Sequence, residues 1–214
     1  GLALAGCATP PLPDTPDALL LNQPVVLLGE VHDNAAQHRL RLRALEALLA
    51  TGARPVLALE QFDRQHQAAI DAALAQSPRL DADAVIAAAQ GAKGWDWAFY
   101  RPFIALALQH GLPIVAANVG TAEARSIMRD GLAAHGFVAE VPAAVMQAHS
   151  EQIVASHCGM VKAQTAARMA LAQVARDQFM ASVLQAHAGR GVVLLAGNGH
   201  VRTDVGAPRW LSAT

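Results

Sequence analysis

Short runs of apolar, often β-branched residues recur along the chain, and each is followed by a segment with helical periodicity. The runs that resemble buried parallel strands cover residues 25–28, 56–59, 114–117 and 192–195. Between them, apolar residues recur three and four positions apart, as on one face of a helix. Alternating strands and helices of this length predict an α/β fold, with a mostly parallel central sheet covered by helices on both faces.

The helix boundaries are also marked in the sequence. Leucines at 42, 45, 48 and 49 predict a helix after the first strand, with Asp33 or Asn34 as its cap and Gly52 as its stop. Further helices are expected over 64–76, 100–109 and 121–134, and a loop over 91–100. An alanine- and methionine-rich stretch at about 140–190 has no strand signal, and it predicts a small α-helical lobe inserted before the last strand.

Composition narrows the class of protein. The chain has 214 residues, of which 53% are hydrophobic and 15% are charged, so it can bury a substantial core and is not intrinsically disordered. Lysine and arginine number 16 against 17 aspartates and glutamates. Because the chain has no excess of positive charge to bind phosphate groups, a nucleic-acid partner is not expected. No apolar run approaches the roughly 20 residues of a membrane-spanning helix.

The N-terminal residues predict a lipid anchor. Leu4-Ala5-Gly6-Cys7 is similar to the lipobox of bacterial lipoproteins, which places a signal-peptide remnant and lipobox at 1–7. Four prolines then favour a tether over 8–22, which leaves 23–214 as the α/β domain. The alternative is an arbitrary chain end with a chance cysteine. If Cys7 is acylated, Cys158 has no partner for an intramolecular disulfide.

Polar side chains follow all four predicted strands. Glu30 and His32 follow the first, Glu60 the second, Asn118 the third and His200 the last. Because the carboxyl ends of parallel strands share one edge, where α/β proteins bind ligands, we expect these side chains to line a common crevice.

Two of these strand ends carry the same motif. Gly-x-x-His follows a Val-Val-Leu-Leu strand at 29–32 and again at 197–200, and Gly29, Gly197 and Asn198 are expected to shape the pocket with Asn118. The glycines permit a tight turn that projects each histidine over the sheet edge. His32, Glu60 and His200 therefore predict a divalent transition-metal site or an acid/base pair. The alternative is that each histidine only caps a strand end.

Several motifs in order resemble the ChaN-like haem-binding lipoproteins of the wider Tiki/TraB/erythromycin-esterase-like superfamily. The resemblance runs from about Val25 to Trp210. The motifs that carry it are Leu28-Gly29-Glu30-Val31-His32-Asp33-Asn34, Leu59-Glu60-Gln61-Phe62, Tyr100-Arg101-Pro102, the segment 113–118, and Gly197-Asn198-Gly199-His200-Val201-Arg202.

The resemblance implies a lipoprotein in the cell envelope of a Gram-negative bacterium, held at the outer membrane through lipid on Cys7. It implies haem binding, with cofacial haems across a homodimer, and service to an outer-membrane haem or iron transport system. In the enzymatic branch of the superfamily, residues matching His32, His200 and Glu60 build a metal-dependent hydrolase centre. Under that alternative Glu30 would be the base that activates water. Whether the chain is an enzyme stays open. A third hypothesis is a lipoprotein that only interacts with partners and whose strand-end residues have a structural role.

Haem requires an apolar slot, an axial ligand and cations for its propionates. The resemblance favours a tyrosine ligand, and Tyr100 is the only tyrosine; Arg101 or a histidine would then stabilise the phenolate. Alternatively, the Tyr100 ring only packs beneath the tryptophans of the 91–100 loop.

Other candidates lie in the predicted lobe. His149 and His157 are about two turns apart on one helix if it is unbroken, although Gly159 also suggests a helix break. Arg176 can meet a propionate or pair with Asp177. His38, by contrast, is expected at a solvated helix surface or end.

Overall fold

The computed structural model describes residues 23–76, 80–91 and 94–211. The predicted lipobox with Cys7 and the tether over 8–22 lie outside this range. None of the helices described is both long and apolar enough to cross a membrane.

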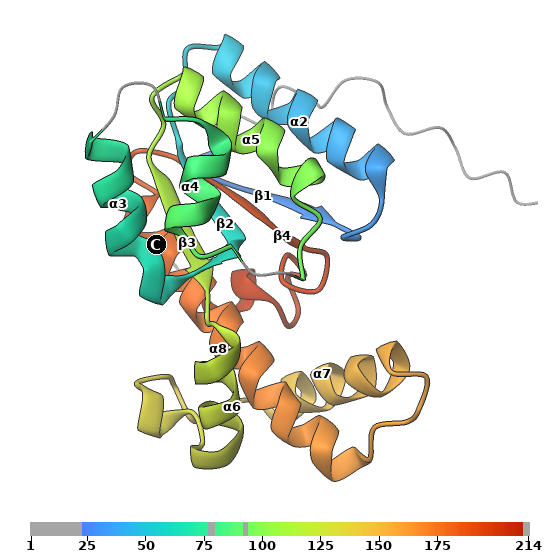
Figure 1. Ribbon diagram of the computed structural model, residues 1–214. Coiled ribbons are helices and arrows are strands. Elements are labelled where there is room, and N and C mark those ends of the chain that lie inside the picture. Colours follow the sequence, from blue (N-terminus) through green and yellow to red (C-terminus); the bar gives the residue numbers. More distant parts are fainter. Residues whose placement is uncertain (1–22, 77–79, 92–93, 212–214) are drawn as a thin grey trace, which may run out of the picture.

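Four parallel strands form the central sheet, in the order β1-β4-β2-β3 (Figure 1). Their bounds are Val25–Glu30 for β1, Val56–Asp63 for β2, Ile114–Asn118 for β3 and Val192–Gly197 for β4. The two strands with the Val-Val-Leu-Leu run are direct neighbours, with each residue of one opposite its counterpart in the other. The predicted α/β fold with a parallel sheet is confirmed, and the carboxyl ends of all four strands share one edge.

One face of the sheet is covered by four helices that pack around a large apolar core. These are α2 (Ala35–Ala50), α3 (Gln67–Gln76), α4 (Ala82–Ala88) and α5 (Trp97–Gln109). Asn34 caps α2 by accepting hydrogen bonds from the backbone N–H groups of Ala36 and Gln37, as expected. Helix α5 begins at Trp97 because Asp96 caps it. The loop predicted over 91–100 therefore extends too far, since its last four residues are helical. Helix α4 was not predicted.

The other face is covered by α8 (Ala163–His187) and the short 3₁₀ helix η3 (Ala207–Trp210). Met180, Val183 and Leu184 of α8 pack on the strands there. Helix α8 has 25 residues, and its first half extends beyond the carboxyl edge of the sheet (Figure 1).

The projecting half of α8 joins α6 (Thr121–Asp130), η2 (Ala133–His135) and α7 (Ala143–Ser156) in a helical lobe (Figure 1). An apolar cluster that includes Ile127 of α6, Val145 of α7 and Val174 of α8 holds these helices together. Helix α6 stops earlier than predicted, because Gly131 adopts a positive φ of 84°. The lobe therefore includes α6, while the second half of α8 packs on the sheet and lies outside the lobe.

Candidate functional site

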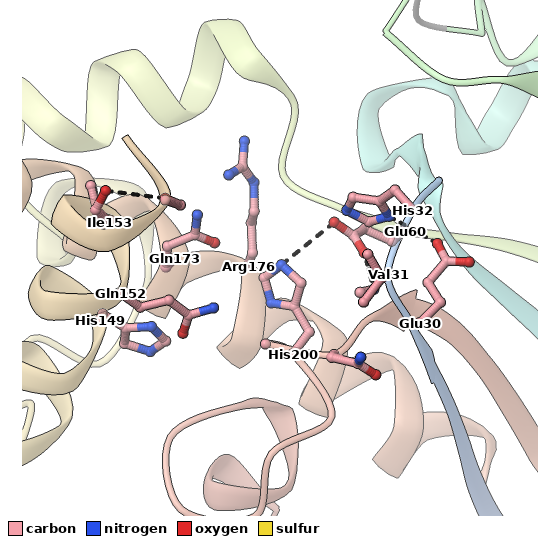
Figure 2. Close-up of a pocket in the computed structure, with 14 residues that line it drawn as sticks. Glu30, Val31, His32, Glu60, His149, Gln152, Ile153, Gln173, Arg176 and His200 are labelled. Atoms are coloured by element: carbon pink, nitrogen blue, oxygen red, sulfur yellow. Dashed lines mark hydrogen bonds and ion pairs between the residues drawn. The ribbon is translucent and has the colours of Figure 1, made fainter. Parts of the chain in front are cut away.

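A cavity of about 590 Å³ lies where the carboxyl edge of the sheet faces the helical lobe (Figure 2). The sheet side is lined by Glu30, Val31, His32, Glu60 and residues 197–200. The lobe side is lined by His149, Gln152, Ile153 and Ser156 of α7 and by Gln173 and Arg176 of α8. The structure thus brings His32, Glu60 and His200 to one cavity and adds His149 and Arg176 opposite them.

Glu30, the last residue of β1, is the centre of a buried polar cluster. Its carboxylate accepts hydrogen bonds from the Tyr100 hydroxyl at 2.6 Å, from Arg41, and from Nδ1 of His32 at 2.9 Å. Tyr100 and His32 bind Oε1 of Glu30, and Arg41 binds Oε2. Nε2 of His38 lies 2.9 Å from the same Oε2. Burial alone would raise the pKa of Glu30, but the hydrogen bond from His32 and the charge of Arg41 outweigh it, so the pKa is lowered. Glu30 is therefore an ionised carboxylate with both oxygens engaged, which leaves little freedom for the water-activating role predicted for it.

Two members of this cluster come from α2. His38 is only 4% exposed, so the expectation of a solvated histidine is wrong. Its ring stacks on Phe99 of α5, with centroids 4.4 Å apart, which removes it from solvent. Arg41 was not predicted at all, although it lies one and two turns before Leu45 and Leu48 on the buried face of the helix. Its spacing from these leucines was the sequence signal that could have placed Arg41 on the buried face.

His32 projects from the end of β1 into the cavity, and its side chain is 51% exposed. The hydrogen bond to Glu30 raises the pKa of His32 and outweighs the effect of burial, which alone would lower this pKa. The edge of its ring meets Trp95, with centroids 4.8 Å apart. The absence of a side chain at Gly197 makes room for the imidazole, since a Cβ there would lie 3.2 Å from Nε2 of His32.

Glu60, His200, Asp177 and His149 form a continuous array of acids and imidazoles, of which all but the buried Asp177 line the cavity. Nε2 of His200 lies 3.5 Å from Oε1 of Glu60, and Nδ1 of His200 lies 2.6 Å from Oδ1 of Asp177. The other Asp177 oxygen lies 3.3 Å from Nε2 of His149. The array therefore joins β2, the turn after β4, α8 and α7, and it links the sheet to the lobe.

The charged forms of His200 and Glu60 stabilise each other. Burial alone would lower the pKa of His200, but the charges of Glu60 and Asp177 raise it to about 10. Burial would raise the pKa of Glu60, but the charge and hydrogen bond of His200 and the backbone N–H of Gly197 lower it to about 2. At neutral pH, His200 is thus an imidazolium between two carboxylates.

Asp177 was not recognised as a site residue, and its proposed pairing with Arg176 is not what the structure shows. Asp177 is completely buried and faces His200 and His149. Arg176 instead lines the cavity, and its Nε donates to the carbonyl oxygen of Val119 at 3.3 Å. Its partners lie far away in the sequence, so no local spacing connects them with Asp177.

Tyr100 lies on the interior side of Glu30 and does not line the cavity. It is 1% exposed, and its hydroxyl hydrogen is donated to Glu30. Burial and the Glu30 carboxylate both raise its pKa, which disfavours the phenolate that iron ligation requires. Arg101 points elsewhere and pairs with Asp83 on the exposed surface, at 2.5 Å.

Three further predicted residues also lie outside the cavity lining. His157 is exposed at the end of α7, where its Nδ1 lies 2.7 Å from the carbonyl oxygen of Ile153. Asn118 donates to Asp63 at 3.0 Å and ties the ends of β3 and β2 together. Gly29 packs under Val201 and Asn198, where a Cβ would meet Val201 at 2.5 Å.

The predicted metal site is not supported by the donor geometry. Among residues 23–76, 80–91 and 94–211, no group of three or more His, Cys, Asp or Glu side chains is arranged to hold a metal ion. The reason lies in the pairings described above, since both nitrogens of His200 face carboxylates and one Glu60 oxygen accepts the Gly197 N–H. The hydrolase alternative, which depends on a metal at these residues, gains no support.

Comparison with known proteins identifies the family. Residues 18–211 match the family model described as haem-binding uptake, Tiki superfamily, ChaN. A solved structure of ChaN of Campylobacter jejuni, described as showing cofacial heme binding, superposes with a TM-score of 0.79 at 26% identity, covering 90% of this chain and 77% of that one. RRSP, a MARTX toxin effector domain from Vibrio vulnificus, gives a TM-score of 0.47 at 19% identity, covering 86% of this chain and 29% of that one. No curated protein sequence matches. The chain therefore belongs to the ChaN family of haem-binding uptake proteins in the Tiki superfamily.

Proposed function

We propose that this protein binds haem in the cavity between the sheet edge and the helical lobe and serves haem or iron uptake. The family assignment and the cofacial heme binding of the Campylobacter relative support haem as the ligand. The observation that carries the proposal is the composition of the cavity wall, which combines imidazoles, a cation and apolar groups.

The cavity has the parts that haem needs. Its volume of about 590 Å³ lies within the usual range of ligand pockets. Val31 at the rim is half-exposed and Ile153 lies opposite it, so both can contact the porphyrin plate. Three imidazoles line the wall, and imidazole nitrogen is a common axial ligand of haem iron. When bound, haem supplies an iron centre that can change its oxidation state.

Arg176 is the group best placed to receive a propionate. Among the described residues it forms no ion pair, and Figure 2 shows its side chain extending between the α7 residues and His200. The amides of Gln152 and Gln173 line the same part of the cavity and can donate to the second oxygen of a carboxylate. His200, whose Nε2 lies 3.5 Å from Glu60, weakens the repulsion between Glu60 and a bound carboxylate.

We also propose that Cys7 carries a lipid anchor and that the protein acts in the envelope of a Gram-negative bacterium. The support is the Leu4-Ala5-Gly6-Cys7 motif and the prolines of the tether over 8–22. A homodimer with cofacial haems and an outer-membrane transport partner are part of the same proposal. The cofacial heme binding of the Campylobacter relative supports the pairing of haems.

Haem binding is tested by titrating purified protein with hemin and recording the Soret band. A saturable shift is expected. Arg176→Met should weaken binding by about 10- to 100-fold, since a charge-assisted hydrogen bond is worth about 1.5–3 kcal/mol. Arg168→Met is the matched control, because Arg168 is exposed two turns earlier on the same helix. A titration without saturation refutes the proposal, and equal affinities of both variants refute the role of Arg176.

A further inference from the structure

We propose that His32 is the axial ligand of the haem iron, and that Glu30 orients its ring and strengthens it as a ligand. This inference rests on the haem binding proposed above and assigns the iron-binding atom within that site. It replaces Tyr100, the residue that the family resemblance suggested.

The hydrogen bond between His32 and Glu30 leaves the correct nitrogen free. An ionised carboxylate only accepts hydrogen bonds, so the hydrogen between the two groups must be on Nδ1 of His32, 2.9 Å from Glu30. In the neutral imidazole, Nε2 then carries the lone pair that a metal requires. His32 lines the cavity and half of its side chain is exposed, so a ligand in the cavity can reach it.

The other imidazoles near the cavity are less suited to this role. Both nitrogens of His200 face carboxylates, and the side chain is mostly buried. His149 is buried, with Nε2 directed at Asp177. His157 has its Nδ1 on a backbone carbonyl, but it is outside the cavity lining.

Glu30 is held firmly enough to fix the His32 ring. Arg41 and the Tyr100 hydroxyl bind its carboxylate from the interior, so it cannot turn away from His32. A carboxylate hydrogen-bonded to the second nitrogen of a ligating histidine fixes the tautomer and raises the basicity of the ligand. Tyr100 is therefore a positioning residue that acts through Glu30.

Two neighbours also hold the ring in place. Trp95 contacts His32 edge-on, and Gly197 allows the imidazole to lie close over the backbone of the turn after β4. The ring is thus confined by the Glu30 hydrogen bond and by contacts on two sides before any ligand is present. A preorganised ligand of this kind loses little rotamer freedom on binding.

The test compares absorption spectra of hemin-loaded wild type, His32→Gly and His187→Gly. His187 is a control histidine at the far end of α8. We expect His32→Gly to lose the wild-type Soret and visible bands and to regain them on addition of free imidazole, whereas His187→Gly keeps the wild-type spectrum. Tyr100→Phe should keep the ligand class with shifted bands, because it alters only the support of Glu30.

Resonance Raman of the ferrous wild-type protein provides a readout that needs no variant. An iron–histidine stretching band is expected, and its absence overturns the inference even if His32→Gly fails to fold. A wild-type spectrum in His32→Gly, or its loss in His157→Gly instead, also overturns it while haem binding stands. If the wild type does not bind hemin saturably, both this inference and the proposed function fail.

Discussion

Asp177→Asn tests whether the buried array between the sheet and the lobe holds the two parts together. The substitution keeps the shape of the side chain and removes its charge. In the wild type, Asp177 accepts from His200 at 2.6 Å and faces His149 at 3.3 Å, completely shielded from water. The variant leaves the His200 imidazolium with Glu60 as its one remaining charged partner in the array.

The expected loss of stability follows from these contacts. Breaking a buried ion pair costs about 3–5 kcal/mol, and the amide oxygen of Asn can retain a neutral hydrogen bond worth about 1 kcal/mol. The free energy of unfolding should therefore fall by about 2–4 kcal/mol. For a domain of this size each kcal/mol lowers Tm by roughly 2–4 °C, so Tm should fall by roughly 4–16 °C.

Urea denaturation at pH 7 measures this change, with Asp83→Asn as the control. Asp83 pairs with Arg101 on the exposed surface, and such pairs contribute about 0–1 kcal/mol. NMR titration of the His200 ring should also show its pKa lowered in Asp177→Asn. The reasoning is refuted if Asp177→Asn unfolds at the same urea concentration as the control, or if the His200 titration is unchanged.

Three further outcomes are expected. The pKa of His200 is raised from 6.5 to about 10, so its contribution to stability is complete below pH 6.5 and is lost as the pH rises toward 10. The pKa of Glu60 is lowered from 4.5 to about 2, so its contribution is complete above pH 4.5 and is lost as the pH falls toward 2. Urea titrations should therefore show the largest difference between wild type and His200→Gln between these limits, at pH 4.5–6.5; a difference independent of pH would contradict this. Arg64→Met removes an ion pair to α6 and cation–π contacts with two phenylalanines, at 5.2 Å each, and should cost about 1–2 kcal/mol in the same assay; no change in urea midpoint would contradict it. Gly197→Ala places a Cβ 3.0 Å from Cε1 of His32 and should lower hemin affinity about tenfold by displacing the ring, and unchanged affinity in a hemin titration would count against the site.

The strands were predictable because each is a continuous apolar run bounded by polar residues. The sheet order could not be read in the same way, since β4, the last strand, lies between β1 and β2. Helix α4 escaped prediction because its seven residues are mostly alanine and give no periodic pattern of large apolar side chains. Strand β2 extends beyond the predicted 56–59 to Asp63. Its register to β3 shifts between Leu59 and Asp63, an irregularity that an apolar run does not reveal.

The site was predictable where its residues directly follow strands. His32, Glu60 and His200 lie together because parallel strands end at one edge, which the sequence pattern implies. Arg41 and Asp177 come from helices, and their approach to the edge depends on how each helix is rotated and packed. Tyr100 shows the same limit, since only the packing of α5 shows that its hydroxyl faces Glu30 rather than the cavity.

NMR of isotope-labelled protein titrated with hemin tests most directly whether haem occupies this cavity. Paramagnetic iron broadens the amide signals nearest to it, and a diamagnetic zinc porphyrin serves as the reference. Loss of the signals of Val31, Gln152 and Gly197 is predicted, with those of Gly52 and Gly111 at the opposite end of the sheet unchanged. Broadening centred elsewhere on the molecule, or none at saturating hemin, would contradict the account.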